Sequence, residues 1–114
     1  MKGRDAGRLS HRVVIQQKTT TTDSQLGRSV VWGTLATVWA AVEALAGNEQ
    51  LQARAVGSQV AYRVEIAYRA DVTPSMRLSW TPYTSTTAKT LEILAVRPKA
   101  GESYRLLLDC GEVA

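Results

Sequence analysis

The stretch AYRVEIAYR, Ala61–Arg69, constrains the fold of this chain more than any other part of its sequence. One parity is apolar or aromatic and comprises Val60, Tyr62, Val64, Ile66 and Tyr68. The other parity carries the charges, Arg63, Glu65 and Arg69. A period of two places alternate side chains on opposite faces of a strand, whereas a helix would scatter them around its circumference. We therefore predict a half-buried strand with its apolar parity inside and its charged parity outside.

Five more segments are typical of short strands because they are rich in β-branched residues or alternate in the same way. They are Leu9–Gln17, Thr34–Leu45, Met76–Trp80, Leu91–Arg97 and Ser103–Cys110. Thr34–Leu45 contains Ala and Leu, which favour helices, but one of its parities is continuously small and apolar, so we predict a strand. The last two segments are predicted to form a hairpin with Pro98 and Gly101 as turn residues.

One segment, Gly47–Gln59, is predicted to be helical. It contains good helix formers, Asn48 is a suitable N-terminal cap, and Gly57 lies near the end. A helix of this length is marginally stable unless it packs against something. About six strands and one short helix predict a mainly β fold, either a small antiparallel barrel that is partly open or a sandwich.

The length of 114 residues predicts a single domain, because a chain this short rarely supports two hydrophobic cores. Within it we predict an extended arm at residues 1–7, a long loop at residues 18–30, and a loop or short helix at residues 46–59. Loops as long as residues 18–30 are uncommon in compact domains and are usually functional or disordered. Two interpretations stay open for this loop: an ordinary disordered surface loop, or a connector that a neighbouring molecule orders.

Composition limits where the chain acts. Hydrophobic residues make up 45% and charged residues 21%, as in ordinary globular domains. No apolar run approaches the roughly 20 residues that span a bilayer, and the amino end lacks the apolar core of a signal peptide. Cys110 is the only cysteine, so an intramolecular disulfide is impossible. We expect the protein to stay in the reducing compartment where it is made and not to enter a membrane.

The residues do not support catalysis, a cofactor, a metal site or a small-molecule substrate. His11 is the only histidine, and His11 and Cys110 lie at opposite ends of the chain, so a metal site would need other ligands. The sequence contains no P-loop, nucleophile elbow or dinucleotide-binding glycine pattern. His11 is expected to be a surface hydrogen-bonding residue and Cys110 a small buried one. The prediction is a protein that is not an enzyme.

The net charge is +4, and basic residues crowd the amino end. A basic end suits nucleic acid or an acidic protein surface, or it is simply a solvated tail. The alternative function is therefore a basic β-barrel that binds single-stranded nucleic acid by stacking bases on exposed rings. Tyr62, Tyr68 and Tyr104 argue against it, because each shares its parity with aliphatic residues and is expected in the core.

Three phrases stand in a specific order: GRLSHRVVIQ from Gly7, ATVWAAVEAL from Ala36, and IAYRADVTPSMRLSW from Ile66. Together with LEILAV and YRLLLDC, they resemble the head–tail joining proteins of long-tailed bacteriophages, also called head-closure or stopper proteins. The resemblance runs from about Gly7 to Cys110. One departure lies between Trp80 and Leu91, where this chain is longer and Thr-rich, which leaves the strand register there undetermined.

The resemblance implies a structural virion protein, a β-barrel subunit of a ring that commonly has six copies. Such a ring lies at the head–tail interface, with the portal and its adaptor ring above and the tail terminator or tail tube below. It helps to retain packaged double-stranded DNA, which passes through the channel without sequence reading, and it docks the tail. The implied location is the virion, with the host cytoplasm during assembly. Related gene-transfer particles use similar parts.

Related closure rings project a loop from between core strands toward the DNA path, and Gly47–Gln59 occupies the matching position. Its candidate channel residues are Asn48, Gln50, Gln52 and Arg54. Arg54 would approach phosphates through charge alone; the alternative is a short helix packed on the open end of the barrel. The candidate contacts with other subunits or the adaptor are Lys2, Arg4, Arg8, Thr20, Asp23, Gln25 and Arg28.

Overall fold

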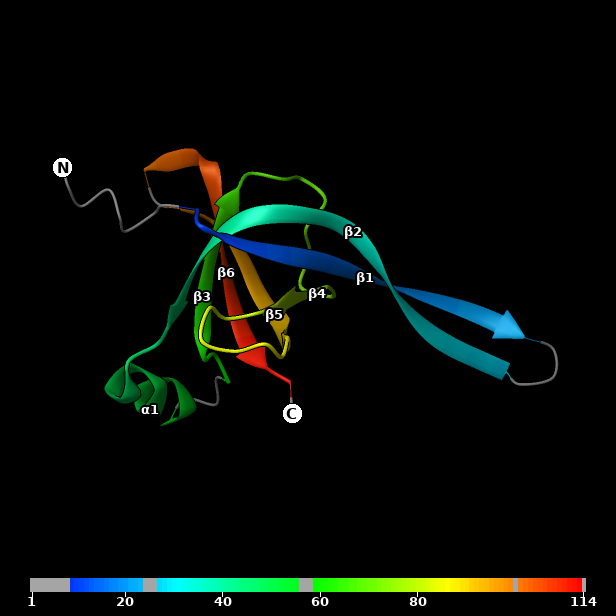
Figure 1. The fold of residues 1–114 in the computed structure, drawn as a ribbon, viewed down its shortest axis with the longest axis horizontal. Coiled ribbons are helices and arrows are strands. Elements are labelled where there is room, and N and C mark those ends of the chain that lie inside the picture. Colours follow the sequence, from blue (N-terminus) through cyan, green and yellow to red (C-terminus); the bar gives the residue numbers. More distant parts are fainter. Residues whose placement is uncertain (1–8, 24–26, 56–58, 100, 114) are drawn as a thin grey trace.

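The computed structural model describes residues 9–23, 27–55, 59–99 and 101–113. The elements are β1 (His11–Asp23), β2 (Gly27–Ala44), α1 (Gly47–Ala55), β3 (Tyr62–Ala67), β4 (Arg77–Trp80), β5 (Lys89–Lys99) and β6 (Glu102–Glu112). The strands form one antiparallel barrel in the order β1-β2-β3-β6-β5-β4 (Figure 1). The predicted mainly β fold, an antiparallel barrel of about six strands with one short helix, is confirmed. The barrel is closed and not partly open.

The barrel closes through β1 and β4, which lie far apart in the sequence. Val13 pairs with Trp80 and Gln16 with Arg77. Because a sheet edge exposes unpaired backbone groups, this pairing removes the two edges that a partly open barrel would leave. Arg77 reinforces it, since its Nε donates a hydrogen bond to Oε1 of Gln16 at 2.7 Å.

The core is built from the inward-facing parity of the strands. Its fully buried members include Val13, Ile15, Val64, Ile66, Leu78, Leu91, Leu108 and Cys110. The alternation predicted for Ala61–Arg69 is confirmed at Val64 and Ile66, and Tyr62 packs half-buried against the same core. The predicted burial of Cys110 is also confirmed.

Tyr68 and Tyr104 were predicted in the core and lie outside it, 55% and 63% exposed. The ladder between β3 and β6 ends at the pair Ala67 and Arg105. Both tyrosines lie beyond that last rung, where the backbone N–H of Tyr68 donates to the carbonyl of Tyr104. Parity predicts the buried side only where the strand is part of the barrel wall, so beyond this ladder it misassigned both rings.

The segment predicted as a long loop is mostly strand. β1 and β2 continue past the barrel as a two-stranded hairpin, from the pair Lys18 and Trp32 to the pair Asp23 and Gly27. This hairpin projects from the barrel and lengthens the molecule to 59 Å against 31 Å in the other directions (Figure 1). We call residues 17–23 and 27–33 the arm. Its many threonines favour strands, although their polarity suggested a loop.

A bulge marks the base of the arm. Ile15 pairs with Ala36 and the next residue, Gln16, pairs with Thr34, so Leu35 is the extra residue on β2. Leu35 nevertheless packs against the core. A bulge bends its strand and increases the local twist, which lets the hairpin leave the curved barrel wall as an extended ribbon.

α1 is inserted between β2 and β3 and stands clear of the barrel (Figure 1). In the described part of the chain, no strand packs against it. The helix begins at Gly47, and the Glu49 carboxylate accepts a hydrogen bond from the Ala46 N–H at 3.3 Å. That contact is half of a capping box. The cap predicted at Asn48 was therefore wrong, and Gly57 lies outside the described residues.

The carboxyl-terminal hairpin is confirmed with a shifted turn. β5 runs through Pro98 to Lys99, so Pro98 is a strand residue and not a turn residue. Gly101 has a φ of 79°, in the left-handed region that glycine adopts without strain. Among the described residues, no helix has the length and apolar character needed to cross a bilayer.

The core packing predicts the effect of a cavity. Leu108 is 0% exposed, so Leu108→Ala should lower the free energy of unfolding by about 2–5 kcal/mol. Leu51→Ala is the matched control, because Leu51 is 70% exposed on α1 and its truncation should change stability by less than about 0.5 kcal/mol. Urea unfolding followed by circular dichroism measures both. Equal destabilisation by the two variants would contradict the core assignment.

Candidate assembly surfaces

His11 ties one end of the barrel together. Its ring stacks on Tyr83 with centroids 4.4 Å apart, and its Nδ1 accepts a hydrogen bond from Nε1 of Trp80 at 3.2 Å. His11 forms a side-chain hydrogen bond, as predicted. It is half-buried and therefore less exposed than the surface position expected for it. Within the described residues, no cluster of three or more potential metal-binding side chains occurs.

The outer face of β3, β5 and β6 carries two carboxylates surrounded by cations. Glu65 is only 8% exposed, because Nζ of Lys99 lies 3.2 Å and Nη1 of Arg105 lies 2.6 Å from its oxygens. Asp109 pairs with Arg97 at 3.2 Å and with Arg63 at 3.6 Å. The charged parity of β3 thus faces outward, as predicted. Glu65 is buried beneath its partners and not by the core.

Trp32 anchors the base of the arm. The guanidinium carbon of Arg77 lies 4.1 Å and Nζ of Lys18 lies 5.9 Å from the centroid of the ring. Farther along the same outward face of β1 and β2, Arg12 lies 4.7 Å over Trp39. Cation–π contacts at partly exposed sites contribute about 0.5–1 kcal/mol each. They fix the ribbon against the barrel where it leaves the wall.

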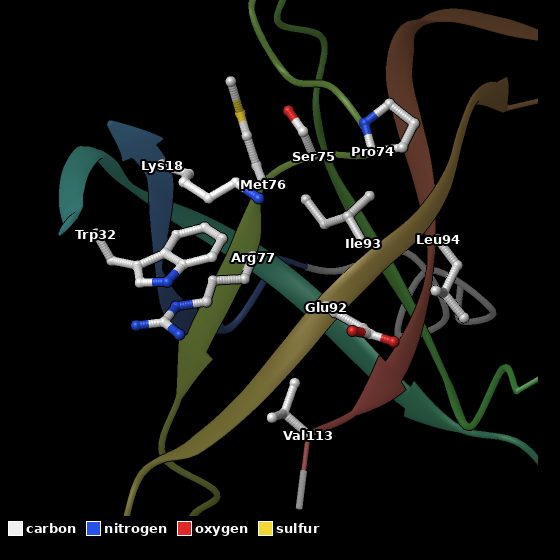
Figure 2. A pocket seen from close by; sticks show the side chains of 10 residues that line it. All are labelled: Lys18, Trp32, Pro74, Ser75, Met76, Arg77, Glu92, Ile93, Leu94 and Val113. Carbon is white, nitrogen blue, oxygen red and sulfur yellow. The ribbon is translucent and has the colours of Figure 1, made fainter. Parts of the chain in front are cut away.

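A hollow of about 380 Å³ lies beside this anchor (Figure 2). It is lined by Lys18, Trp32, Pro74, Ser75, Met76, Arg77, Glu92, Ile93, Leu94 and Val113. Two of its apolar side chains, Leu94 and Val113, are 38% and 42% exposed to solvent. β4 begins at Arg77, and the hollow therefore opens where β1 loses its second neighbouring strand.

Comparison with known proteins places the chain in a family. A model of the phage head completion protein family matches residues 4–113. The chain belongs to this family. No curated protein matches it. A solution structure of a protein from Shigella flexneri 2a is 28% identical, with a TM-score of 0.75 over 95% of this chain and 96% of that one. A chain in the virion of a native gene transfer agent particle shares the fold, with 22% identity and a TM-score of 0.62 over 93% and 96%.

A phage head completion protein is a structural component of the virion and not an enzyme. Its location is the virion, and its partners are other head and tail proteins. The barrel, with its two projecting segments, is therefore best understood as an assembly part. The surfaces described above are candidates for contact with those proteins.

The predicted contact residues of this head completion protein fall on two separate projections. Thr20 is exposed on the arm, and Asp23 and Arg28 lie in strand near its tip. Asn48 and Gln52 are exposed on α1, which also contains Gln50 and Arg54. The remaining predicted contacts, Lys2, Arg4, Arg8 and Gln25, lie outside the described residues.

The nucleic-acid-binding alternative requires exposed aromatic rings beside cations. The structure exposes more rings than the sequence predicted. Trp39 is 51% exposed, and Arg105 lies 5.5 Å over the exposed Tyr104. A guanidinium already covers one face of each ring, and the rings lie on different strands. They do not form one open stacking platform. Family membership decides for the virion protein.

The anchor at Trp32 and the adjoining hollow were missed by the sequence analysis. Trp32 follows a segment that reads as a loop, so its pairing with Lys18 was invisible without the hairpin register. Arg77 comes from a strand more than 40 residues later, and no local pattern links it to Trp32. The threonine run was the one signal that could have extended β1 through this region.

Cys110 has chemistry that can be tested directly. It is 0% exposed, and burial, with a smaller contribution from the charge of Asp109, raises the pKa of its thiol to about 12. The thiol therefore stays protonated and shielded at pH 8, and we expect no labelling by a thiol reagent in the folded protein. The same reagent should label one thiol per chain in urea. Rapid labelling without denaturant would contradict the buried position.

Proposed function

We propose that this head completion protein is a subunit of the ring that closes the head–tail channel. It sits below the portal and adaptor, helps to retain packaged double-stranded DNA and offers the surface on which the tail terminator or tail tube docks. The observation that carries the proposal is the family match, which covers residues 4–113 and thus nearly the whole chain.

The architecture suits such a subunit. Copies around a ring meet through heterologous interfaces, in which one patch contacts a different patch on the neighbour. In the closed barrel, each strand pairs with two neighbouring strands over part of its length, and the barrel carries the arm and the hollow as two different surfaces. Apolar side chains exposed on the arm, Val30 and Val31, gain from burial only after assembly.

α1 is the proposed channel segment. It stands clear of the barrel, and its described side chains are largely exposed. Within the described residues, no strand of the same chain packs against it. These observations favour a partner outside the subunit over the alternative of a helix packed on the barrel end. DNA fits that place, because Arg54 supplies a positive charge and contact with phosphates needs no base reading.

Imaging of the assembled particle tests the ring and its orientation together. We expect a closed ring, commonly of six copies, between the portal adaptor and the tail, with α1 facing the channel. Variant particles with Arg54→Gln should retain less DNA than particles with Gln59→Glu, a control beyond the helix that changes the charge by the same one unit. A ring with Arg54 at its outer rim would remove the DNA contact, and particles without a ring would overturn the proposal.

The basic amino end is proposed to contact an acidic surface of the adaptor or of a neighbouring subunit. We expect deletion of residues 1–7 to leave the urea midpoint unchanged and to reduce the yield of complete particles. Lys2→Ser combined with Arg4→Ser keeps the length and removes charge, so it separates a charge effect from a length effect. Normal particle yield from the deletion would contradict the contact.

A further inference from the structure

We propose that neighbouring copies join edge to edge through their arms. Residues 17–23 of β1 in one copy pair with residues 30–33 of β2 in the next, so that a continuous antiparallel sheet runs from subunit to subunit. This inference rests on the proposed ring and specifies which surfaces form its interface.

The arm has two strand edges with no neighbouring strand among the described residues. β4 pairs with β1 only along Val13–Gln16, and β3 pairs with β2 only along Ala40–Ala44. Residues 17–23 of β1 and 30–33 of β2 are therefore each paired on one side. Such edges present a row of backbone donors and acceptors that template another strand. A two-stranded hairpin alone is only marginally stable in water, so a third strand stabilises it.

The described side chains of the arm give it little of the usual protection against strand addition. Exposed edges are normally blunted by lysine, proline or a bulge. The bulge lies at the base, the arm contains no proline, and the one charged side chain described on it, Lys18, leans over Trp32. Val30 and Val31 are 53% and 54% exposed and point to opposite faces of the ribbon. Side chains of an added strand would cover part of each from the side.

A second copy of this chain fits both edges at once. β1 and β2 run in opposite directions, so an arm laid alongside in the same orientation presents its β2 edge antiparallel to the β1 edge of its neighbour. Repetition of this contact is head-to-tail, which is the type of interface that closes rings. A strand from a different protein would satisfy one edge and leave the other open.

The hollow beside Trp32 supplies a place for a side chain of the incoming strand. It opens where β1 loses β4 as its neighbour. Met76 gives it an apolar side chain near Lys18, and Leu94 lines it on the opposite side (Figure 2). In strand addition, backbone hydrogen bonds provide affinity and pockets for alternate side chains provide selectivity.

Mixed single-cysteine variants test the pairing. Thr20 and Val30 face each other within one copy, and the proposed pairing places Thr20 of one copy opposite Val30 of the next in the same register. Thr20→Cys and Val30→Cys are therefore made in separate copies that are expressed together in particle-producing cells. After mild oxidation of assembled particles, we expect disulfide-linked dimers from the mixture and none from either variant alone. Buried Cys110 serves as the internal background.

Each other outcome is informative. Dimers from a single variant would show like edges pairing by two-fold symmetry and would overturn the proposal. A ring that is visible by electron microscopy but yields no mixed dimer would overturn the arm pairing and leave the proposed function intact. Particles without a ring would remove the proposed function itself.

A charge on the edge gives an independent test that does not depend on oxidation. Val30→Lys should abolish ring incorporation while the urea midpoint changes little, because position 30 is solvent-exposed in the single subunit. Thr86→Lys is the control, since Thr86 is exposed in the connection between β4 and β5. Normal incorporation of Val30→Lys would contradict the proposal.

Discussion

The pairing of β1 with β4 is the constraint on which the rest of this structure depends. It joins residues 13–16 to residues 77–80 and converts a six-stranded sheet into a closed barrel. Closure buries the inward parity on all sides, and it also decides where pairing stops. Because β4 begins at Arg77, β1 continues beyond it with one side open, and the arm, the Trp32 anchor and the hollow all originate at that point.

Much of the fold could be predicted from the sequence, because a strand with one buried face records its environment every second residue. Val64 and Ile66 were assigned to the core for that reason. Alternation predicts no strand where neither face is buried. The threonine run of the arm has no apolar parity and was read as a loop, although Thr favours strands. Tyr68 and Tyr104 failed for the opposite reason, since their parity was extrapolated past the last rung of the ladder.

The candidate surfaces were harder to predict than the core. The cluster of Gln16, Trp32 and Arg77 joins three strands, and its members are brought together only by barrel closure. The Glu65 cluster likewise needs Lys99 and Arg105 from the last hairpin. The sequence does indicate that two polar segments, the arm and α1, lie between apolar strands. In this phage head completion protein, the arm and α1 leave the barrel on different sides (Figure 1).

The bulge at Leu35 separates two parts of the hairpin that obey different rules. Below it, Val13 and Ile15 must keep their parity because the core fills around them. Above it, no core side chain depends on the length of the ribbon. Adding one residue to each strand would extend the reach of the arm by about 3.4 Å and leave the interior untouched. The length of the arm can therefore change without a change in core packing. The distance that the arm bridges to a neighbouring molecule is thus independent of the stability of the fold.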